Sequence, residues 1–358
     1  MQLFLPHKGC SPLGNLPTSL CVMVVFVLIL VGCHSQTRFD EKGWQLVWND
    51  EFDGASIDLS KWSHEVNCYG GGNSEAQCYT ANAGNSYVAN GSLHIVAIKE
   101  QYSGPADKDD HPNYDADDKS VTKDYTSARL RTLGKGDWRY GRFEVRAKFP
   151  KGQGTWGAAW MLPTDWVYGE WASSGEIDIV EAVNLGTVSD EYLASHKQPQ
   201  ARLLETRIHG TLHYGKEWPE NVYSGQSYRL VGHENPADGF HVYAIEWEQG
   251  EIRWYMDGKH YATQTAQGWY SEPVTGVLAE NDAPFNQHFH FIVNLAVGGD
   301  WAGTVNEKGV DASIFPQAFE IDYVRVYRCS VAVETGKGCA DIQEDAVMVE
   351  GKFDEREF

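Results

Sequence analysis

The feature that most constrains the fold is a long series of short strand patterns, separated by Gly, Asn, Asp and Pro, over residues 44–328. Residues 142–149 (RFEVRAKF) alternate strictly between apolar and polar side chains, which predicts a strand with one buried face. Further strands are predicted at residues 240–247 and 321–327, and a hairpin at residues 251–261, turning at Asp257-Gly258. Many evenly spaced strands are typical of an antiparallel β-sandwich or barrel.

Three other segments stand out along the chain. Residues 289–297 (FHFIVNLAV) are apolar on both faces, which predicts a central strand. Residues 102–124 are polar and acidic and predict an exposed loop, whereas residues 189–205 predict the one helix. We therefore expect a single all-β domain over residues 44–328.

The N-terminal end of the chain carries a targeting signal. Residues 20–31 (LCVMVVFVLILV) form an apolar run of 12 residues, too short for a transmembrane helix of about 20 residues. Lys8 precedes this run, as in a signal peptide. The run leads into Cys33, in a pattern that resembles a bacterial lipobox. The alternative is an ordinary signal peptide with a chance cysteine.

These signals define the expected organisation. Residues 1–32 are a lipoprotein signal peptide, and residues 33–43 are a lipidated Cys33 followed by a short linker. Residues 44–328 form the domain, and residues 329–358 form an acidic, solvated tail. We expect a protein that is anchored to the cell envelope, at the outer membrane, or secreted.

Four cysteines remain in the mature chain after Cys10 and Cys21 leave with the signal and Cys33 takes lipid. An even number in an exported protein indicates disulfides. The simplest pairing joins near neighbours, and the alternative is four free thiols. The expected disulfides are Cys68–Cys78 and Cys329–Cys339.

The formal net charge is −21, and loss of the single positive charge of Lys8 with the signal leaves −22. Such a surface repels nucleic acid and sulfated polymers at long range. A neutral substrate is compatible with it. We expect no nucleic-acid partner and a monomeric protein.

Residues 174–182 (SGEIDIVEA) concentrate the candidate chemistry. In a regular strand Glu176 and Asp178 share one face, and Glu181 falls on the opposite one. A one-residue bulge near residues 179–180 returns Glu181 to the face of Glu176. The two Cα atoms are then about 13 Å apart, and the inward-leaning carboxyl groups approach to about 5 Å, as a retaining glycosidase requires. The alternative is an exposed acidic strand of purely structural origin.

Several motifs, in order along the chain, resemble family 16 of the glycoside hydrolases, and in particular its bacterial laminarinases. The resemblance covers residues 44–327. It is carried by the motifs LVWNDEF (46–52), YTSARLRT (125–132), WRYGRFEVRAKFPKGQGTWGAAWMLP (138–163), GEIDIVEA (175–182), HGTLHYGKEWPENVYSG (209–225), NLAVGGDWAG (294–303) and IDYVRVY (321–327). The resemblance implies a concanavalin A-like jelly-roll sandwich with a substrate cleft on its concave face.

The resemblance also implies roles for the three acidic residues. Glu176 would be the nucleophile, Asp178 would orient it, and Glu181 would be the acid/base. No cofactor is needed for this chemistry, although relatives often hold a structural calcium. That ion would take the side chain of Asp322 and the carbonyl groups of Glu51 and Gly91.

Aromatic residues are candidates for sugar binding, because the apolar face of a pyranose stacks on an aromatic ring. The chain has 13 tryptophans, and core packing explains part of this number. Trp156 and Trp160 are spaced to share a strand face, and Trp171 lies on the approach to the acidic motif. The resemblance places Trp156 and Trp171 near the bound sugar.

Three polar residues complete the candidate set. Asn73 resembles an asparagine that binds sugar hydroxyls, with a turn residue as the alternative. Arg142 is interpreted as a partner of the nucleophile or substrate, or as a surface ion-pair residue. His209 and His213 have a spacing that suggests a metal, but on a strand they merely share a face. We expect His213 to bind sugar.

The sequence thus predicts a retaining endo-β-1,3-glucanase. One alternative keeps the chemistry but changes the polymer to mixed-linkage glucan, agar or carrageenan. Another is a glucan-binding lipoprotein without catalytic activity. The three intact acidic residues argue against it.

Overall fold

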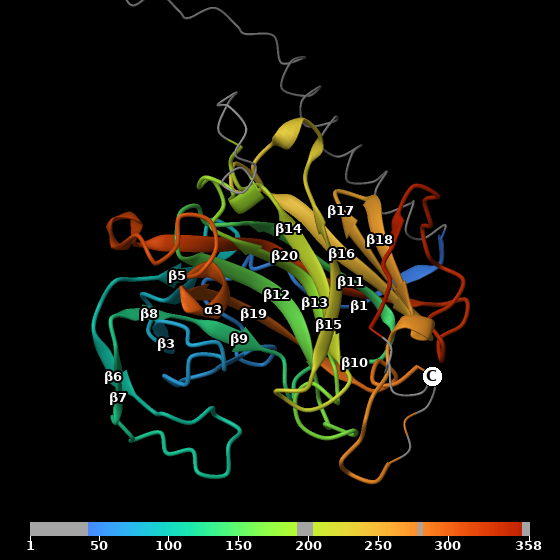
Figure 1. Ribbon diagram of the computed structural model, residues 1–358, viewed down its shortest axis with the longest axis horizontal. Helices are drawn as coiled ribbons and strands as arrows, with labels where there is room; N and C mark the ends of the chain where they lie inside the picture. Colours follow the sequence, from blue (N-terminus) through green and yellow to red (C-terminus); the bar gives the residue numbers. More distant parts are fainter. Residues whose placement is uncertain (1–41, 192–202, 278, 280–281, 353–358) are drawn as a thin grey trace, which may run out of the picture.

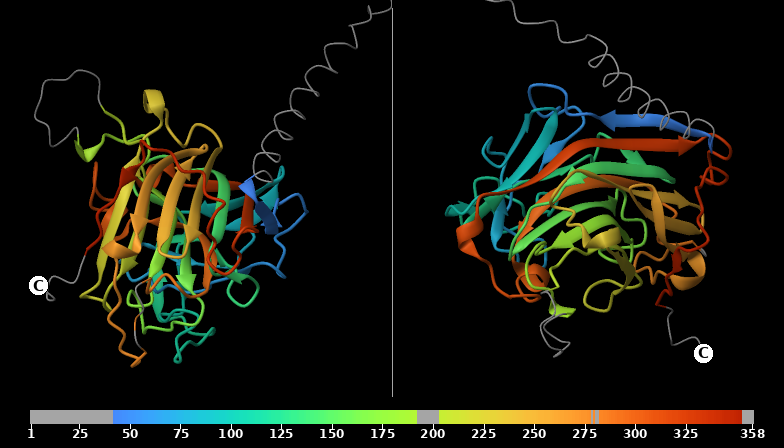
Figure 2. Two further views of the ribbon diagram at one scale, coloured as in Figure 1. Left: turned by 90° about the vertical axis from the view of Figure 1, so that its right-hand side faces the viewer. Right: turned by 90° about the horizontal axis from the view of Figure 1, so that it is seen from above.

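A computed structural model of the chain describes residues 42–191, 203–277, 279 and 282–352. Two curved β-sheets lie face to face (Figures 1 and 2). Within the described residues, sheet A has nine strands and sheet B has eight. Within these two sheets neighbouring strands are antiparallel, except where β21 joins β18 of sheet A. The predicted all-β sandwich is confirmed.

Sheet A has the order β21-β18-β17-β16-β11-β20-β5-β4, and β1 also pairs with β20. Its strands are β1 (Trp44–Asp50), β4 (Ser86–Ala89), β5 (Ser92–Ala97), β11 (Gly141–Lys148), β16 (His241–Glu248), β17 (Glu251–Met256), β18 (Lys259–Thr265), β20 (Gln317–Cys329) and β21 (Val347–Met348).

Sheet B has the order β15-β14-β13-β12-β19-β9-β2, and β10 also pairs with β19. Its strands are β2 (Ser63–His64), β9 (Arg129–Arg131), β10 (Asp137–Trp138), β12 (Thr155–Pro163), β13 (Glu176–Val183), β14 (Ile208–Tyr214), β15 (Val222–Tyr228) and β19 (Phe289–Val297).

The remaining elements are short. They are two-stranded pairs, β3 (Gln77–Tyr79) with β8 (Tyr125–Ser127) and β6 (Tyr102–Gly104) with β7 (Val121–Lys123), the helix α3 (Gly299–Ala302), and the 3-10 turns η1 (Val231–His233), η2 (Ala266–Gly268) and η3 (Ala312–Ile314).

The core fills the space between the sheets and follows the predicted periodicities. Phe143 and Val145 of β11 face Ile177 of β13 and Phe291 of β19 in one buried cluster. All nine residues of β19 are buried, as its two apolar faces predicted. The alternating apolar residues of each strand therefore fix which face of sheet B remains available for a site.

The predicted hairpin is confirmed, since β17 and β18 pair around Asp257 and Gly258. The predicted helix lies mostly on residues 192–202, outside the described residues. At its end the prediction is wrong, because Leu204 bridges Val188 and the Ser189 amide donates to the Leu203 carbonyl. The predicted loop over residues 102–124 contains the β6–β7 pair at its base.

Both predicted disulfides are present, Cys68–Cys78 and Cys329–Cys339. The second begins a C-terminal segment that differs from the expected solvated tail, because residues 330–352 pack along sheet A. The Asp341 amide donates to the buried Glu246 carboxylate at 2.9 Å, and β21 pairs with β18. In Figure 1 this red segment lies beside β18, whose edge it covers.

The predicted signal peptide and Cys33 lie outside the described residues. Among the residues that the structure describes, no helix is long and apolar enough to cross a membrane.

Candidate active site

The acidic motif lies on β13, between β12 and β14 in sheet B. Along β12, Ala159 pairs with Val180 but Trp160 pairs with Asp178, so Ile179 is an extra residue. The register with β14 shifts over the same stretch. This is the predicted bulge, and it returns Glu181 to the face of Glu176 and Asp178. We call this face of sheet B, turned away from sheet A, the acidic face.

Two tryptophan side chains hold the outer carboxylates. The Trp171 indole N–H donates to Glu176 Oε2 at 2.6 Å, and the Trp156 indole N–H donates to Glu181 Oε1 at 3.0 Å. Trp156 lies on β12, and Trp171 lies in the loop before β13. The structure thus brings both predicted sugar-binding tryptophans to the carboxylates. Each indole also orients the carboxylate that it contacts.

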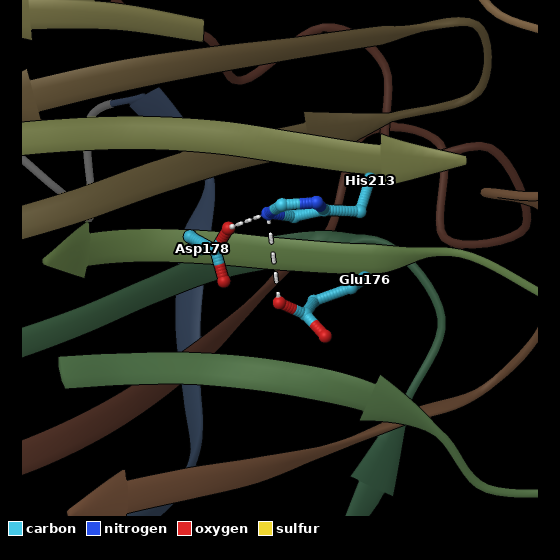
Figure 3. A group of neighbouring side chains, drawn as sticks. All are labelled: Glu176, Asp178 and His213. Carbon is cyan, nitrogen blue, oxygen red and sulfur yellow. Dashed lines mark ion pairs between the residues drawn. The ribbon is translucent and has the colours of Figure 1, made fainter. Parts of the chain in front are cut away.

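His213 of β14 lies beside Glu176 and Asp178, at one end of the acidic face (Figure 3). Its Nε2 is 3.3 Å from Asp178 Oδ2 and 3.8 Å from Glu176 Oε1. His213 pairs directly with Glu176 across the two strands, and directly opposed residues point to the same side of a sheet. His213 therefore lies on the same side of sheet B as the carboxylates, and its role in sugar binding stays a prediction.

The electrostatics of the acidic face favour bound protons. Burial, followed by repulsion from the Asp178 carboxylate, raises the pKa of Glu176 to about 8. Burial raises the pKa of Glu181 to about 7, although His213 and the Trp156 indole lower it. Burial and repulsion from Glu181 raise the pKa of Asp178 well above its usual range. Near neutral pH the cluster can therefore hold one carboxyl as an acid and another as a base.

Donor atoms of Glu176, Asp178 and His213 lie within 4.8 Å of one another, a spacing that could also hold a metal ion. His209 is separate from this group. It pairs with Glu181 across the strands, and its ring contacts Trp301 at 5.0 Å. Burial lowers the pKa of His209 to about 4. The two histidines therefore do not form the paired metal site that their spacing suggests.

Asn73 and Glu75 lie in the same loop before β3. Glu75 was not among the residues predicted from the sequence. The Asn73 side chain donates to Glu75 Oε1 at 3.3 Å, and Gln77 and Tyr79 donate to Glu75 Oε2. Glu75 contributes to the raised pKa of Glu181, so its negative charge acts on the acidic face. No pattern around residue 75 distinguishes it from an ordinary loop acid.

Trp301, in the short helix α3 that follows β19, was also missed. Its ring contacts Trp156 at 5.3 Å, edge to face. A tryptophan in a Gly-rich segment is only a weak indication of a site residue, because nothing local shows that this segment lies beside β12 in the fold.

Trp160 lies on the acidic face, opposite Asp178, as its spacing from Trp156 predicted. Its indole N–H donates to Asn294 Oδ1 at 2.7 Å, and the Arg129 guanidinium lies 4.6 Å from its ring. Its role in sugar binding stays a prediction.

The interpretation of Arg142 as a partner of the nucleophile or substrate is wrong. Arg142 is on β11 in sheet A, where its side chain is buried and contacts Glu144 at 2.8 Å and Glu246 at 3.0 Å. Because the polar face of β11 points away from sheet B, this residue cannot reach the acidic face. The alternative ion pair is present, but it is buried rather than exposed.

The predicted calcium ligands lie near the same part of β20 in sheet A. Asp322 of β20 lies between the stretch paired with β1, which ends next to Glu51, and the stretch paired with β5, which begins after Gly91. However, Asp322 Oδ2 is 2.5 Å from the Arg146 guanidinium, and Glu51 contacts Arg325. A bound ion would have to take Asp322 from Arg146, so calcium binding stays a prediction.

Carboxylic acids placed together on one face of a sheet are the arrangement that glycoside hydrolases use for acid/base and nucleophilic chemistry. The sequence profile of the glycosyl hydrolases family 16 matches residues 106–313, and the chain belongs to this family. The fold is accordingly the family's jelly roll.

Relatives and solved structures agree with this placement. The chain is 40% identical over 294 residues to the glucan endo-1,3-beta-glucosidase A1 of Niallia circulans, a match that covers 80% of this chain and 38% of that protein's length. It is 38% identical to a beta-glucanase of Rhodothermus marinus, covering 88% of this chain and 98% of that protein. The X-ray structure of the laminarinase from Rhodothermus marinus matches with a TM-score of 0.60 and 38% identity, covering 80% of this chain and 97% of that one.

Proposed function

We propose that the protein is a retaining endo-β-1,3-glucanase. The observation that carries the proposal is the bulge in β13, which aligns Glu176, Asp178 and Glu181 on one face with an indole N–H on each outer carboxylate. The relatives described above act on β-1,3-glucan or β-glucan according to their names. A neutral polymer also suits a chain with a net charge of −21.

In the first half of the reaction, ionised Glu176 attacks the anomeric carbon and forms a glycosyl-enzyme. Protonated Glu181 donates its proton to the leaving glycosidic oxygen. The pKa of Glu176 is about 8 and that of Glu181 is about 7, so the proton rests first on Glu176. Moving it to Glu181, as the reaction requires, costs about 1.4 kcal/mol, which is small beside a catalytic barrier. The assignment of Glu176 as the nucleophile rests on its place in the family motif.

In the second half, Glu181 removes a proton from water, which releases the sugar from Glu176 with retained configuration. Glu176 is neutral while it is esterified, so the pKa of Glu181 falls at this stage and the carboxylate can act as a base. The Trp171 indole N–H, 2.6 Å from Glu176 Oε2, and the neighbouring Asp178 orient Glu176. The cycle consumes no cofactor.

The test is reducing-sugar release from laminarin, mixed-linkage glucan, agar and carrageenan. We expect the highest rate on laminarin; preference for another polymer would replace the proposed substrate and keep the chemistry. Glu176→Ala should abolish hydrolysis and regain synthetic activity with an activated α-glycosyl fluoride. Glu344→Ala, at an exposed acidic residue of the C-terminal segment, is the matched control. Wild-type binding to laminarin without hydrolysis would favour the non-catalytic glucan-binding lipoprotein.

We also propose that the protein is exported and that Cys33 carries the lipid that attaches it to the bacterial cell envelope. Residues 20–33 support this proposal, since a short apolar run is followed by Gly32 and then by the cysteine. A structural calcium at Asp322 is a further proposal, supported by the convergence of Glu51, Gly91 and Asp322 on the same part of β20.

A further inference from the structure

The acidic face continues past His213 to an exposed aromatic residue. His213 of β14 pairs directly with Tyr223 of β15, so the two side chains lie on the same side of sheet B. Their rings are 5.7 Å apart and tilted by 35°. Because β15 is the edge strand, Tyr223 lies two strand spacings from β13, or roughly 10 Å. That distance leaves room for a sugar ring next to the one that contacts the carboxylates.

A second exposed aromatic residue lies in the connection between β14 and β15. The Trp218 amide donates to the Trp171 carbonyl at 2.9 Å, and the Ala172 amide donates to the Lys216 carbonyl at 3.3 Å. Lys216 also forms ion pairs with Glu220 at 2.7 Å and Glu272 at 3.4 Å. This connection is therefore fastened to the loop whose Trp171 holds Glu176.

Trp218 and Tyr223 are the two most exposed aromatic residues among those that the structure describes, ahead of Tyr69 at 50%. Trp218 is 72% exposed and Tyr223 is 65% exposed. Among the tryptophans that the structure describes, Trp218 is the one whose side chain is largely open to solvent. Tyr87 of β4, by comparison, is 39% exposed and stacks on His94. Leaving large aromatic surface in water is unfavourable, and such surface next to an active site marks a binding position.

We propose that Trp218 and Tyr223 form an aromatic platform that binds a sugar ring of the polysaccharide chain beyond the ring at the carboxylates. The ligand class is a neutral glucan chain, since an aromatic ring offers stacking to the apolar face of a pyranose and no charge. Continuity with the acidic face through Trp171 and His213 supports this choice. The proposal rests on the proposed function and deepens it, because the platform would select long chains over short ones.

The test compares a long β-1,3-gluco-oligosaccharide with an aryl β-glucoside of one or two sugar units. Tyr223→Ala and Trp218→Ala should each lower kcat/KM on the long substrate about tenfold, mainly through KM, because a stacked ring contributes that much to binding. Both variants should leave the short substrate within twofold of wild type. Tyr223→Phe, which keeps the ring, should restore the rate, and Tyr87→Ala is the matched control on sheet A.

The outcomes separate the two proposals. Equal losses on both substrates, no loss on either, or a Tyr223→Phe variant as weak as Tyr223→Ala would overturn the platform. A wild-type protein that hydrolyses neither laminarin nor its oligosaccharides would instead overturn the proposed function. Titration of Glu176→Gln with laminari-oligosaccharides gives a readout without turnover: adding Tyr223→Ala should weaken binding of the long chain about tenfold, and unchanged affinity would contradict the platform.

Discussion

Neutralising Glu176 should stabilise the fold while it abolishes hydrolysis. In the folded protein the pKa of this carboxyl rises from 4.5 to about 8. Between these values the folded chain binds a proton that the unfolded chain has released, so stability falls as pH rises through this window. Below pH 4.5 this cost is absent. Glu176→Gln replaces the carboxylate with a neutral group of the same shape and removes the cost.

The size of the effect follows from the same pKa values. A rise from 4.5 to about 8 in an isolated group corresponds to roughly 5 kcal/mol above pH 8. Asp178 and Glu181 share the protons of the acidic face with Glu176. Glu176→Gln alone should therefore recover only part of the lost folding stability, about 1–3 kcal/mol. For a domain of this size that is a rise in Tm of roughly 2–6 °C.

The assay is thermal unfolding of wild type and Glu176→Gln at pH 4.5, 6 and 8, with laminarin hydrolysis measured on the same samples. The difference in Tm should be near zero at pH 4.5 and should grow towards pH 8. Glu344→Gln makes the same chemical change at an exposed position and should show no such trend. A Tm difference that is independent of pH, or that shrinks as pH rises, would refute the reasoning.

Three further expectations concern other groups. Asp178→Asn should move both limbs of the kcat/KM profile to lower pH, because the Asp178 carboxylate raises the pKa of Glu176 and the Asp178 and Glu181 carboxylates repel each other; limbs that stay in place or move upward would contradict this. Cys33→Ala should shift the protein from the membrane to the soluble fraction, with loss of fatty acid by mass spectrometry; unchanged fractionation and no fatty acid on the wild type would rule out the anchor. Chelation by EDTA should leave kcat unchanged and lower Tm if calcium binds at Asp322, and Asp322→Asn should remove that difference; a fall in kcat without a change in Tm would point to a metal at the acidic face.

Much of the fold could be predicted because the relevant signals are local. Strict alternation over residues 142–149 and the doubly apolar residues 289–297 correspond to β11 and β19. The bulge in β13 could also be predicted from the spacing of its acids, since only an extra residue brings Glu181 to the face of Glu176. The helix prediction is wrong near residue 204, because Leu204 forms a β-bridge with Val188 and this backbone pairing outweighs a weak helical pattern.

The sequence by itself determined the β-sandwich, the strand that carries the three acidic residues, and the tryptophans next to that strand. Side-chain periodicity and motif spacing are properties of the chain alone, so these features can be recognised without the fold. Only the tertiary structure decided which partners those residues meet. Arg142 has the pattern of a polar strand residue, yet its partner Glu246 lies 104 residues away in a neighbouring strand. Glu75, in a loop, and Trp301, in helix α3, likewise come to the acidic face from distant parts of the chain. Their local sequence contains no such information, because contacts between remote segments depend on how the two sheets and their loops are assembled.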